Sequence, residues 1–148
     1  MALTITLDYK LVKRPAPLEP IKGPYAKVVL TGPKERLNVI ALVDSGADTC
    51  AIPRGIAEIL GLKLGEKAEP VIGLGGEIAA YQARLDIVVE GTHEKHVLDN
   101  IPVNVLATKA GDDFPVILGR EGFFEAFEIT FKERAQKIIL KKVSSSAF

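Results

Sequence analysis

A carboxylate, a hydroxyl and a glycine stand side by side in the stretch LVDSGADTC, residues 42–50. Asp44 follows the apolar run 39–43, which reads as a strand and delivers the carboxylate to the mouth of a turn. Gly46 can take a backbone conformation that other residues avoid, and its lack of a side chain leaves space beside Asp44 for a ligand. Asp, Ser and Gly are also the residues of an ordinary β-turn, so the triplet alone does not decide between a site and a turn.

A second apolar run ends in a similar way about seventy residues further on, where residues 116–118 precede Gly119 and Arg120. Between the two blocks lies the glycine-rich stretch VIGLGGEIAAY, residues 71–81, which is typical of a β-hairpin with a loose tip. The stretch lacks the Lys-Ser/Thr of a phosphate-binding loop and the spacing of G-x-G-x-x-G. Together with the balanced charge, this disfavours a phosphate or small-molecule site there.

Hydrolysis of an amide by carboxylates needs two of them. One takes a proton from water while the other, protonated, polarises the carbonyl, and two carboxyls about 3 Å apart share one proton. The chain holds one Asp-Ser/Thr-Gly triplet, and the internal alternatives Asp112 and Asp113 lie in AGDDFP, which reads as a turn. A two-fold axis beside Asp44 would bring the same residue from a second copy of the chain.

The elements that must position these residues are mostly strands. Apolar and polar residues alternate from Leu3 to Tyr9, the period of a half-buried strand. Two short helices are expected, one at 53–62 between Pro53 and Gly61, and one at 119–127, where three phenylalanines fall at helical spacing. The remaining β-branched runs predict antiparallel sheets closed on themselves. These runs are 25–30, 38–43, 83–90, 96–107 and 137–143.

Composition narrows the classes of function. With 19 basic and 19 acidic residues and 47% hydrophobic residues, the chain is typical of a soluble globular protein, and nucleic acid is not an expected partner. No stretch approaches the roughly 18 uninterrupted apolar residues of a membrane helix, so no membrane partner is expected. The opening MALTITLDYK lacks the features of a secretion signal, which predicts a cytoplasmic protein.

Histidine and cysteine suggest two further chemistries. His93 and His96 lie three residues apart, but a zinc helix of the form H-E-x-x-H needs its second histidine where Val97 stands. Both histidines are therefore expected in exposed turns, and no metal site is predicted. The lone Cys50 excludes an intrachain disulfide, and no local base supports it as a nucleophile.

The order of these features resembles the retropepsin-like aspartic proteases, the single-lobed relatives of pepsin that include the retroviral proteases. The resemblance covers residues 25–140 and rests on the block from Asp44 to Ala47, the glycine-rich hairpin and the block 116–120. It implies a mostly β, closed barrel of the acid-protease fold. It also implies a homodimeric aspartic endopeptidase in which Asp44 from each subunit forms the dyad, without a metal or organic cofactor.

The resemblance assigns roles around this carboxylate. Ser45 would link the two active-site loops across the dimer axis, Gly46 would offer main-chain contacts to a peptide, and Ala47 would line the site. Asp48 would contact the substrate backbone and pair with Arg120, bracing the loop against the second expected helix. The plain alternative for that pair is a solvent-exposed ion pair worth at most about 1 kcal/mol.

The hairpin at 71–81 resembles the flap that closes over the substrate in this family, and an ordinary glycine-rich turn is the alternative. The substrate, a peptide or an unfolded protein, is expected to bind as an extended strand between the active-site floor and the flaps. The expected contacts outside the Asp44 loop are Ile72, Gly73, Leu74, Gly75, Gly76, Ile78, Val116 and Ile117.

Two features depart from the retroviral pattern. Cys50 stands where that family has a threonine or serine, and a thiol is a weaker hydrogen-bond partner. The helix at 53–62 has no counterpart in the shortest retroviral enzymes and resembles one in cellular and bacterial members. The main alternative to a protease is a non-catalytic peptide-binding or dimerisation module that kept the fold.

Proline content divides the chain. The stretch KRPAPLEPIKGP, residues 13–24, predicts an extended connector that stays out of any sheet interior. We therefore expect an N-terminal strand and connector at 1–24, a protease-like domain at 25–143 and a frayed tail at 144–148. Three roles stay open for residues 1–24: dimer interface, inhibitory cover, or a segment that the enzyme removes.

Overall fold

The computed structural model describes residues 4–73, 76–107 and 114–143, and in this part the chain is mostly β. It contains one α-helix, α1 (Arg54–Leu60), and a 3-10 turn, Phe124–Ala126, among these residues. The strands are β1 (Thr4–Asp8), β2 (Lys10–Val12), β3 (Ile21–Gly23), β4 (Tyr25–Thr31), β5 (Arg36–Val43), β6 (Cys50–Ile52), β7 (Glu69–Gly73), β8 (Gly76–Glu90), β9 (Lys95–Leu106), β10 (Val116–Leu118), β11 (Phe127–Lys132) and β12 (Lys137–Lys142).

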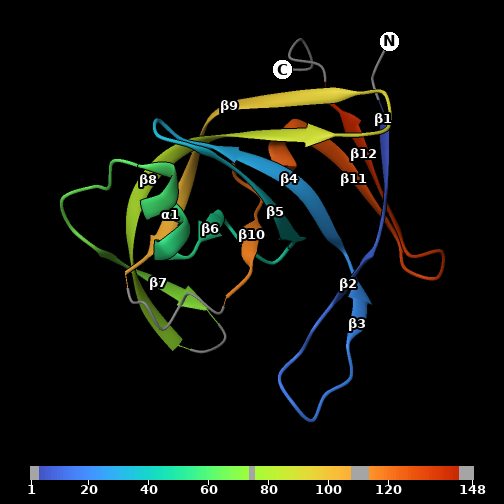
Figure 1. The fold of residues 1–148 in the computed structure, drawn as a ribbon, viewed down its shortest axis with the longest axis horizontal. Helices are drawn as coiled ribbons and strands as arrows, with labels where there is room; N and C mark the ends of the chain where they lie inside the picture. The colour runs from blue at the N-terminus through green and yellow to red at the C-terminus, as the bar shows by residue number, and fades with distance from the viewer. Residues whose placement is uncertain (1–3, 74–75, 108–113, 144–148) are drawn as a thin grey trace.

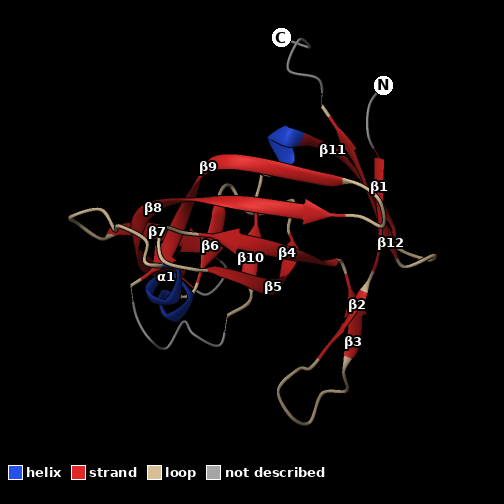
Figure 2. Ribbon diagram, turned by 45° about the horizontal axis from the view of Figure 1, so that its top comes forward, coloured by secondary structure: helices blue, strands red, loops and turns tan. Residues whose placement is uncertain are grey.

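Six of the described strands close into a barrel in the order β4-β5-β10-β6-β9-β8, and the pairing of β4 with β8 completes the ring. β7 extends this sheet from the side of β8 (Figures 1 and 2). The expected closed β-barrel is confirmed. The expectation of antiparallel sheets throughout is wrong, because β10 runs parallel to β5 and β6 runs parallel to β9. Parallel neighbours need long crossover connections, which the period of a single strand cannot reveal.

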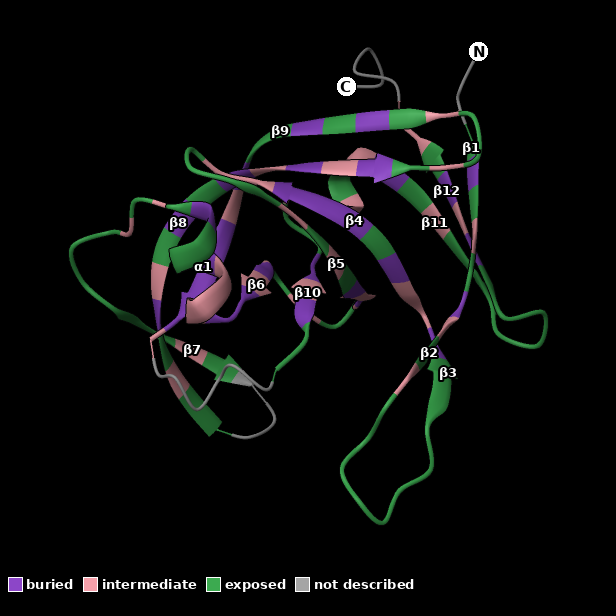
Figure 3. Cartoon of the chain, in the orientation of Figure 1, coloured by how far each residue is buried: buried purple, intermediate pink, exposed green. Residues whose placement is uncertain are grey.

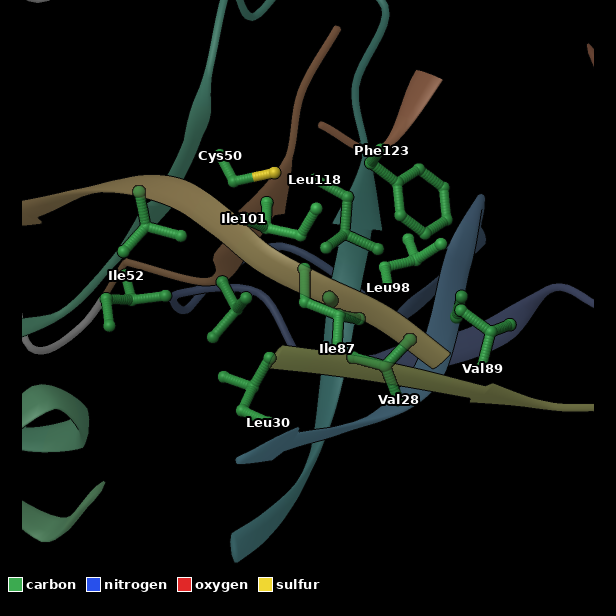
Figure 4. Close-up of a cluster of buried hydrophobic side chains, with 14 of the residues drawn as sticks. Val28, Leu30, Cys50, Ile52, Ile87, Val89, Leu98, Ile101, Leu118 and Phe123 are labelled. Carbon is green, nitrogen blue, oxygen red and sulfur yellow. The ribbon is translucent and has the colours of Figure 1, made fainter. Parts of the chain in front are cut away.

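Alternating side chains direct one face of the barrel strands inward. In β4, Ala26, Val28 and Leu30 are buried and Lys27 is exposed, although Val29 on the outer face is buried as well. Figure 3 shows buried and exposed positions along the barrel strands. Val28 and Leu30 meet Ile87 and Leu118 inside the barrel (Figure 4). Burying each such aliphatic side chain contributes about 1.5–3 kcal/mol. The core therefore stabilises the strands from which these residues come, including β10.

The first expected helix is confirmed. α1 starts after Pro53, which stands at the N-cap with a φ of −63°, and ends at Gly61, whose left-handed φ of 72° few other residues adopt readily. Ala57 and Leu60 are its buried residues. The helix lies against the outside of the barrel, where it contacts β9 (Figure 1).

The second expected helix, 119–127, is wrong. Only the 3-10 turn Phe124–Ala126 forms there, and Phe127 already begins β11, opposite Lys142 of β12. Phe123 is fully buried and packs against Phe127 with ring centroids 5.3 Å apart. Burial of these rings and pairing with β12 outweigh the helical spacing of the phenylalanines.

The N-terminal segment takes part in the same body as the barrel. β1 pairs with β12 over five residues, and β12 pairs with β11 on its other side. Ile5 and Tyr9 belong to the hydrophobic core. The proline-rich residues 13–20 join β2 to β3 in a small hairpin that projects from the body (Figures 1 and 2). Residues 144–148, expected to fray, lie outside the described residues.

Within residues 4–73, 76–107 and 114–143, no helix has the length and apolar character needed to cross a membrane.

Candidate active site

Asp44 lies where two parallel strands end together. Leu42 and Val43 of β5 are in register with Ile117 and Leu118 of β10, so the residues that follow, Asp44 and Gly119, emerge at the same end of the barrel. The main-chain N–H of Asp44 donates to the carbonyl of Leu118 at 3.0 Å. The two blocks that are about seventy residues apart in the sequence therefore form one site.

The turn after β5 holds the carboxylate in one orientation. The N–H of Gly46 donates to Oδ1 of Asp44 at 2.9 Å, and the N–H of Ala47 donates to the Asp44 carbonyl at 3.2 Å. Asp44 is half-buried, while Ser45 and Gly46 are exposed. In the described part of the chain, no group is bonded to the second carboxylate oxygen, Oδ2. The turn therefore holds the acid through Oδ1 and leaves Oδ2 without a hydrogen-bond partner among the described residues.

Gly46 does not play the conformational part expected from the sequence. Its φ lies outside the left-handed region that glycine favours, so the prediction of a special backbone conformation is wrong. Its small size still matters, because a Cβ at this position would stand 3.3 Å from Oδ1 of Asp44, and the carboxylate would have to shift by a few tenths of an ångström. The glycine leaves room beside the carboxylate and supplies the N–H that orients it.

The turn after β10 holds the loop at residues 44–49, the Asp44 loop, through main-chain hydrogen bonds. Arg120 donates its N–H to the carbonyl of Ala47, and Glu121 donates to the carbonyl of Asp48, both at 2.9 Å. Gly119 permits this contact, since a Cβ there would stand 2.3 Å from the carbonyl oxygen of Thr49. A side chain of any kind at position 119 would push the two turns apart.

Cys50 ties the same two turns together from inside the barrel. Its Sγ accepts the N–H of Gly119 at 3.3 Å, and its thiol lies 3.8 Å from the carbonyl of Glu121. Burial raises the pKa of the Cys50 thiol, against smaller opposing effects from the main-chain N–H groups of Gly119 and Phe123. A buried, protonated thiol is a poor nucleophile, and here it acts as a hydrogen-bonding part of the loop.

Asp48 and Arg120 form the expected ion pair. Both side chains are exposed, Arg120 by 61% and Asp48 by 84%, so the pair contributes at most about 1 kcal/mol. The main-chain bonds of Arg120 and Glu121 brace the loop more directly than this pair does. Because no helix forms at 119–127, the loop is braced against a turn.

A chain of hydrogen-bonded polar side chains, not expected from the sequence, lies beside the loop. Asn104 donates through Nδ2 to Oγ1 of Thr49 at 2.6 Å and accepts through Oδ1 from Nε2 of Gln82 at 2.7 Å. Asn104 is 8% exposed. A single buried amide within the apolar run 101–106 is the signal that could have drawn attention to it.

The glycine-rich stretch forms the expected hairpin. β7 and β8 pair from Glu69 opposite Ala80 to Gly73 opposite Gly76. Ile72 is 86% exposed, and Ile78 on β8 is half-buried. Leu74 and Gly75, expected at the tip, lie outside the described residues. The hairpin projects from the barrel (Figure 1), and the exposed Ile72 lies on its β7 strand.

The remaining predicted residues divide between core and surface. Val116 is buried in the core at 4% exposure, so its expected place in a substrate pocket is not compatible with its position. Ile117, on the opposite face of β10, is half-buried, and its position is compatible with a substrate pocket. Asp112 and Asp113, the internal candidates for a second carboxylate, lie outside the described residues.

His96 is not in an exposed turn. It lies in β9 at 7% exposure, with its ring 5.7 Å from that of Phe127 in an edge-to-face arrangement. Burial lowers the pKa of His96, Lys142 lowers it further, and Glu94 opposes the shift. His93 is exposed as expected. Among the described residues, no three His, Cys, Asp or Glu side chains are grouped as a metal ion would need.

Two surface hollows of the single chain lie away from the carboxylate. One, of about 440 Å³, lies beside Gln82 and Arg84, and another, of about 290 Å³, lies between Pro33 and Asn100. Neither includes Asp44 or Ile72. The single chain thus supplies the half-buried carboxylate of Asp44 and a projecting hairpin, and neither of these two hollows reaches them.

Comparison with known proteins identifies the family. A family model described as aspartyl protease matches residues 6–121, which include the Asp44 loop and end at Glu121. The chain therefore belongs to the aspartyl proteases, and it is an aspartic-type endopeptidase with a retropepsin-like fold.

Two solved structures illustrate the similarity. A retropepsin-like aspartic protease from Rickettsia conorii matches with a TM-score of 0.59 at 16% identity, over 98% of this chain and 97% of that one. The EIAV protease complexed with the inhibitor HBY-793 matches with a TM-score of 0.47 at 22% identity, over 74% of this chain and 88% of that one. The search of curated proteins found no match.

Proposed function

We propose that this aspartic protease works as a homodimer in which Asp44 of each subunit contributes one half of a catalytic dyad. The observation that supports this most strongly is the half-buried carboxylate of Asp44, held on a clamped turn at an open end of the barrel. The carboxylate next along the chain, Asp48, is paired with Arg120. A two-fold axis beside Asp44 supplies the second acid that the reaction needs.

The dyad hydrolyses a peptide bond with one water molecule. The ionised carboxylate takes a proton from the water as its oxygen attacks the carbonyl carbon, and the protonated carboxyl donates to the carbonyl oxygen. The resulting gem-diol breaks its C–N bond as the carboxyl that took the proton from water passes it to the leaving nitrogen, while the other carboxylate takes a proton from one diol hydroxyl and the C=O bond re-forms. One carboxylic acid and one amine leave, and the dyad again holds a single shared proton.

The substrate is an unfolded protein or a peptide in extended form, lying between the two Asp44 loops and the two flaps. Of the expected apolar contacts that the structure describes, Ile72, Ile78 and Ile117 are at least partly exposed and can line this space. Closure of the hairpin would cover the peptide and exclude water from the reacting bond. Gly46 and Asp48 lie on the exposed loop, where their groups can meet the peptide backbone.

The remaining loop residues fit the roles implied by the family. Ser45 is exposed at the turn, so its hydroxyl is free to bond with the loop of the second subunit. Ala47 is half-buried, and its carbonyl accepts the N–H of Arg120, which keeps the loop in place.

A shared proton predicts a bell-shaped dependence of kcat/KM on pH, with its maximum on the acid side of neutral. The two limbs belong to the pair of carboxylates. The test is cleavage of an unstructured protein between pH 4 and 9, with a pepstatin-like transition-state mimic as inhibitor. A flat profile would contradict the dyad, and peptide binding without turnover would favour a non-catalytic binding module.

A further inference from the structure

Three polar side chains from three separate segments form a continuous chain of hydrogen bonds. Gln82 of β8 donates to Asn104 of β9 at 2.7 Å, and Asn104 donates to Thr49 of the Asp44 loop at 2.6 Å. Both distances are those of well-formed hydrogen bonds. The chain joins the strand that carries the flap to the loop that carries the catalytic acid.

Asn104 occupies the central position because of the strand register. It lies opposite Gln82 in the β8–β9 pair and opposite Ala51 in the β9–β6 pair. Its neighbours Val103 and Val105 point into the core, so the Asn104 side chain lies on the other face of β9. At 8% exposure the amide would be costly without partners, and both of its ends have one.

Thr49 is the point at which this chain reaches the catalytic loop. It lies five residues after Asp44 and forms a parallel bridge with Glu121. The main-chain clamp from residues 120 and 121 holds Ala47 and Asp48. The bond from Asn104 therefore gives the loop a side-chain attachment to a different strand, β9.

Gln82 is the point at which the chain reaches the flap. β8 runs without a break from Gly76, at the base of the hairpin tip, to Glu90. The carbonyl of Gln82 also accepts the N–H of Gly65 at 2.8 Å, which fixes the strand at this position. Gln82 lies within two residues of Ala80, where β8 pairs with β7 of the hairpin on one side and with β9 of the barrel on the other.

We propose that Asn104 is a positioning residue that orients the catalytic loop through Thr49 and couples this orientation to the flap through Gln82. The inference about catalysis rests on the proposed function of the Asp44 dyad. Its consequence is that closure of the flap over a peptide favours the loop geometry needed for hydrolysis. Loss of the coupling should then lower kcat more than it raises KM.

The first variants remove one link at a time. Thr49→Val keeps the shape of the side chain but offers no oxygen to Asn104. Asn104→Leu removes both bonds, and Gln82→Leu removes the bond to the flap strand. Loss of a hydrogen bond of about 1.4 kcal/mol corresponds to about a tenfold loss of rate. We expect kcat to fall about tenfold in Thr49→Val and Asn104→Leu, with KM changed less than about twofold.

Conservative variants provide the rescue. In Asn104→Asp the carboxylate still accepts from the Gln82 amide, and the Thr49 hydroxyl can donate to it, so both links persist. Thr49→Ser keeps the hydroxyl. Both should retain kcat within about threefold of the wild type, since each loses little hydrogen bonding. Thr130→Val, at an exposed position in β11, is the matched control and should leave kcat and KM unchanged.

A cycle of double variants tests the coupling itself. Gln82 and Thr49 are linked only through Asn104 in this chain of bonds. The effects of Gln82→Leu and Thr49→Val on kcat should therefore deviate from additivity by about threefold or more. The same pair of changes made in Asn104→Leu should be additive. Equal non-additivity in both backgrounds would contradict a role for Asn104.

Amide hydrogen exchange supplies a readout that does not depend on turnover. Exchange of the peptide 44–49 should rise about tenfold in Asn104→Leu, while exchange of the core strand β4 stays unchanged. Wild-type protein that cleaves nothing would contradict the proposed function, yet this measurement would still test the attachment. Unchanged exchange at 44–49, or a uniform rise across the domain, would overturn the inference.

Discussion

At the scale of single residues, the shape of the Asp44 loop depends on two glycines that have no side chain to block close contacts. Gly119 lets the carbonyl of Thr49 approach, and Gly46 leaves space for the carboxylate of Asp44. Cys50 fills the place of a hydroxyl residue, and its sulfur accepts the N–H of Gly119. The retroviral pattern has a threonine or serine at this position. The Cys50 thiol therefore keeps a hydrogen bond between the two turns although the hydroxyl is absent.

Replacing Cys50 tests this link. Cys50→Ala removes the acceptor and leaves the buried N–H of Gly119 without a partner, which should lower the free energy of unfolding by about 1–3 kcal/mol. Cys50→Ser keeps an acceptor at nearly the same place and should lose less. Urea unfolding of the two variants gives the comparison. Equal stability of both variants would show that the sulfur does not hold the turn.

His96 makes stability depend on pH. Burial holds its folded pKa below the unfolded value of about 6.5, so below that pH the unfolded chain binds more protons than the folded one. The free energy of unfolding should therefore fall as the pH drops from 7 towards 5. His96→Phe keeps a ring against Phe127 and should weaken this dependence, whereas exposed His93→Gln should not. An unchanged slope in His96→Phe would contradict the assignment.

At the scale of elements, hydrophobic pattern predicted most strands and one helix correctly. The runs at 25–30, 38–43, 83–90, 96–107 and 137–143 lie in strands except for their last residues Ala107 and Val143, because their alternation matches one buried face. Phe123 and Phe127 have helical spacing but are used in the core and in β11. The spacing of apolar residues indicates that they are buried, and it cannot say which partner buries them.

We expect residues 1–24 to contribute to the stability of the folded chain, which argues against their removal by the enzyme. A chain beginning at Tyr25 lacks β1 and loses the buried side chains of Ile5 and Tyr9. At about 1.5–3 kcal/mol for each buried side chain, its free energy of unfolding should fall by about 3–6 kcal/mol. Urea unfolding of this shortened chain beside the full one tests the expectation. Equal stability would favour removal of residues 1–24 as a step in maturation.

At the scale of the whole molecule, the resemblance predicted the barrel and the position of Asp44 more fully than the pattern of residues did. Closure through β4 and β8 and the parallel pairs β5–β10 and β6–β9 depend on contacts distant in the sequence. The link from Gln82 to Thr49 was equally hidden, because it depends on strand register. Single-sequence patterns report burial and turns, whereas register arises from the assembled core.

The central proposal is that each active site uses Asp44 from both subunits. Mixed dimers of wild-type and variant chains test this proposal most directly. Asp44→Asn keeps the size of the side chain and should fold and dimerise like the wild type. Wild-type chains are equilibrated with about a ninefold excess of this variant, and cleavage is measured with the molecular mass in the same samples. If each site needs Asp44 from both subunits, activity per wild-type chain falls to about one tenth, because few wild-type chains then pair with one another. Activity per wild-type chain that stays constant in a dimer of unchanged mass would contradict the shared dyad.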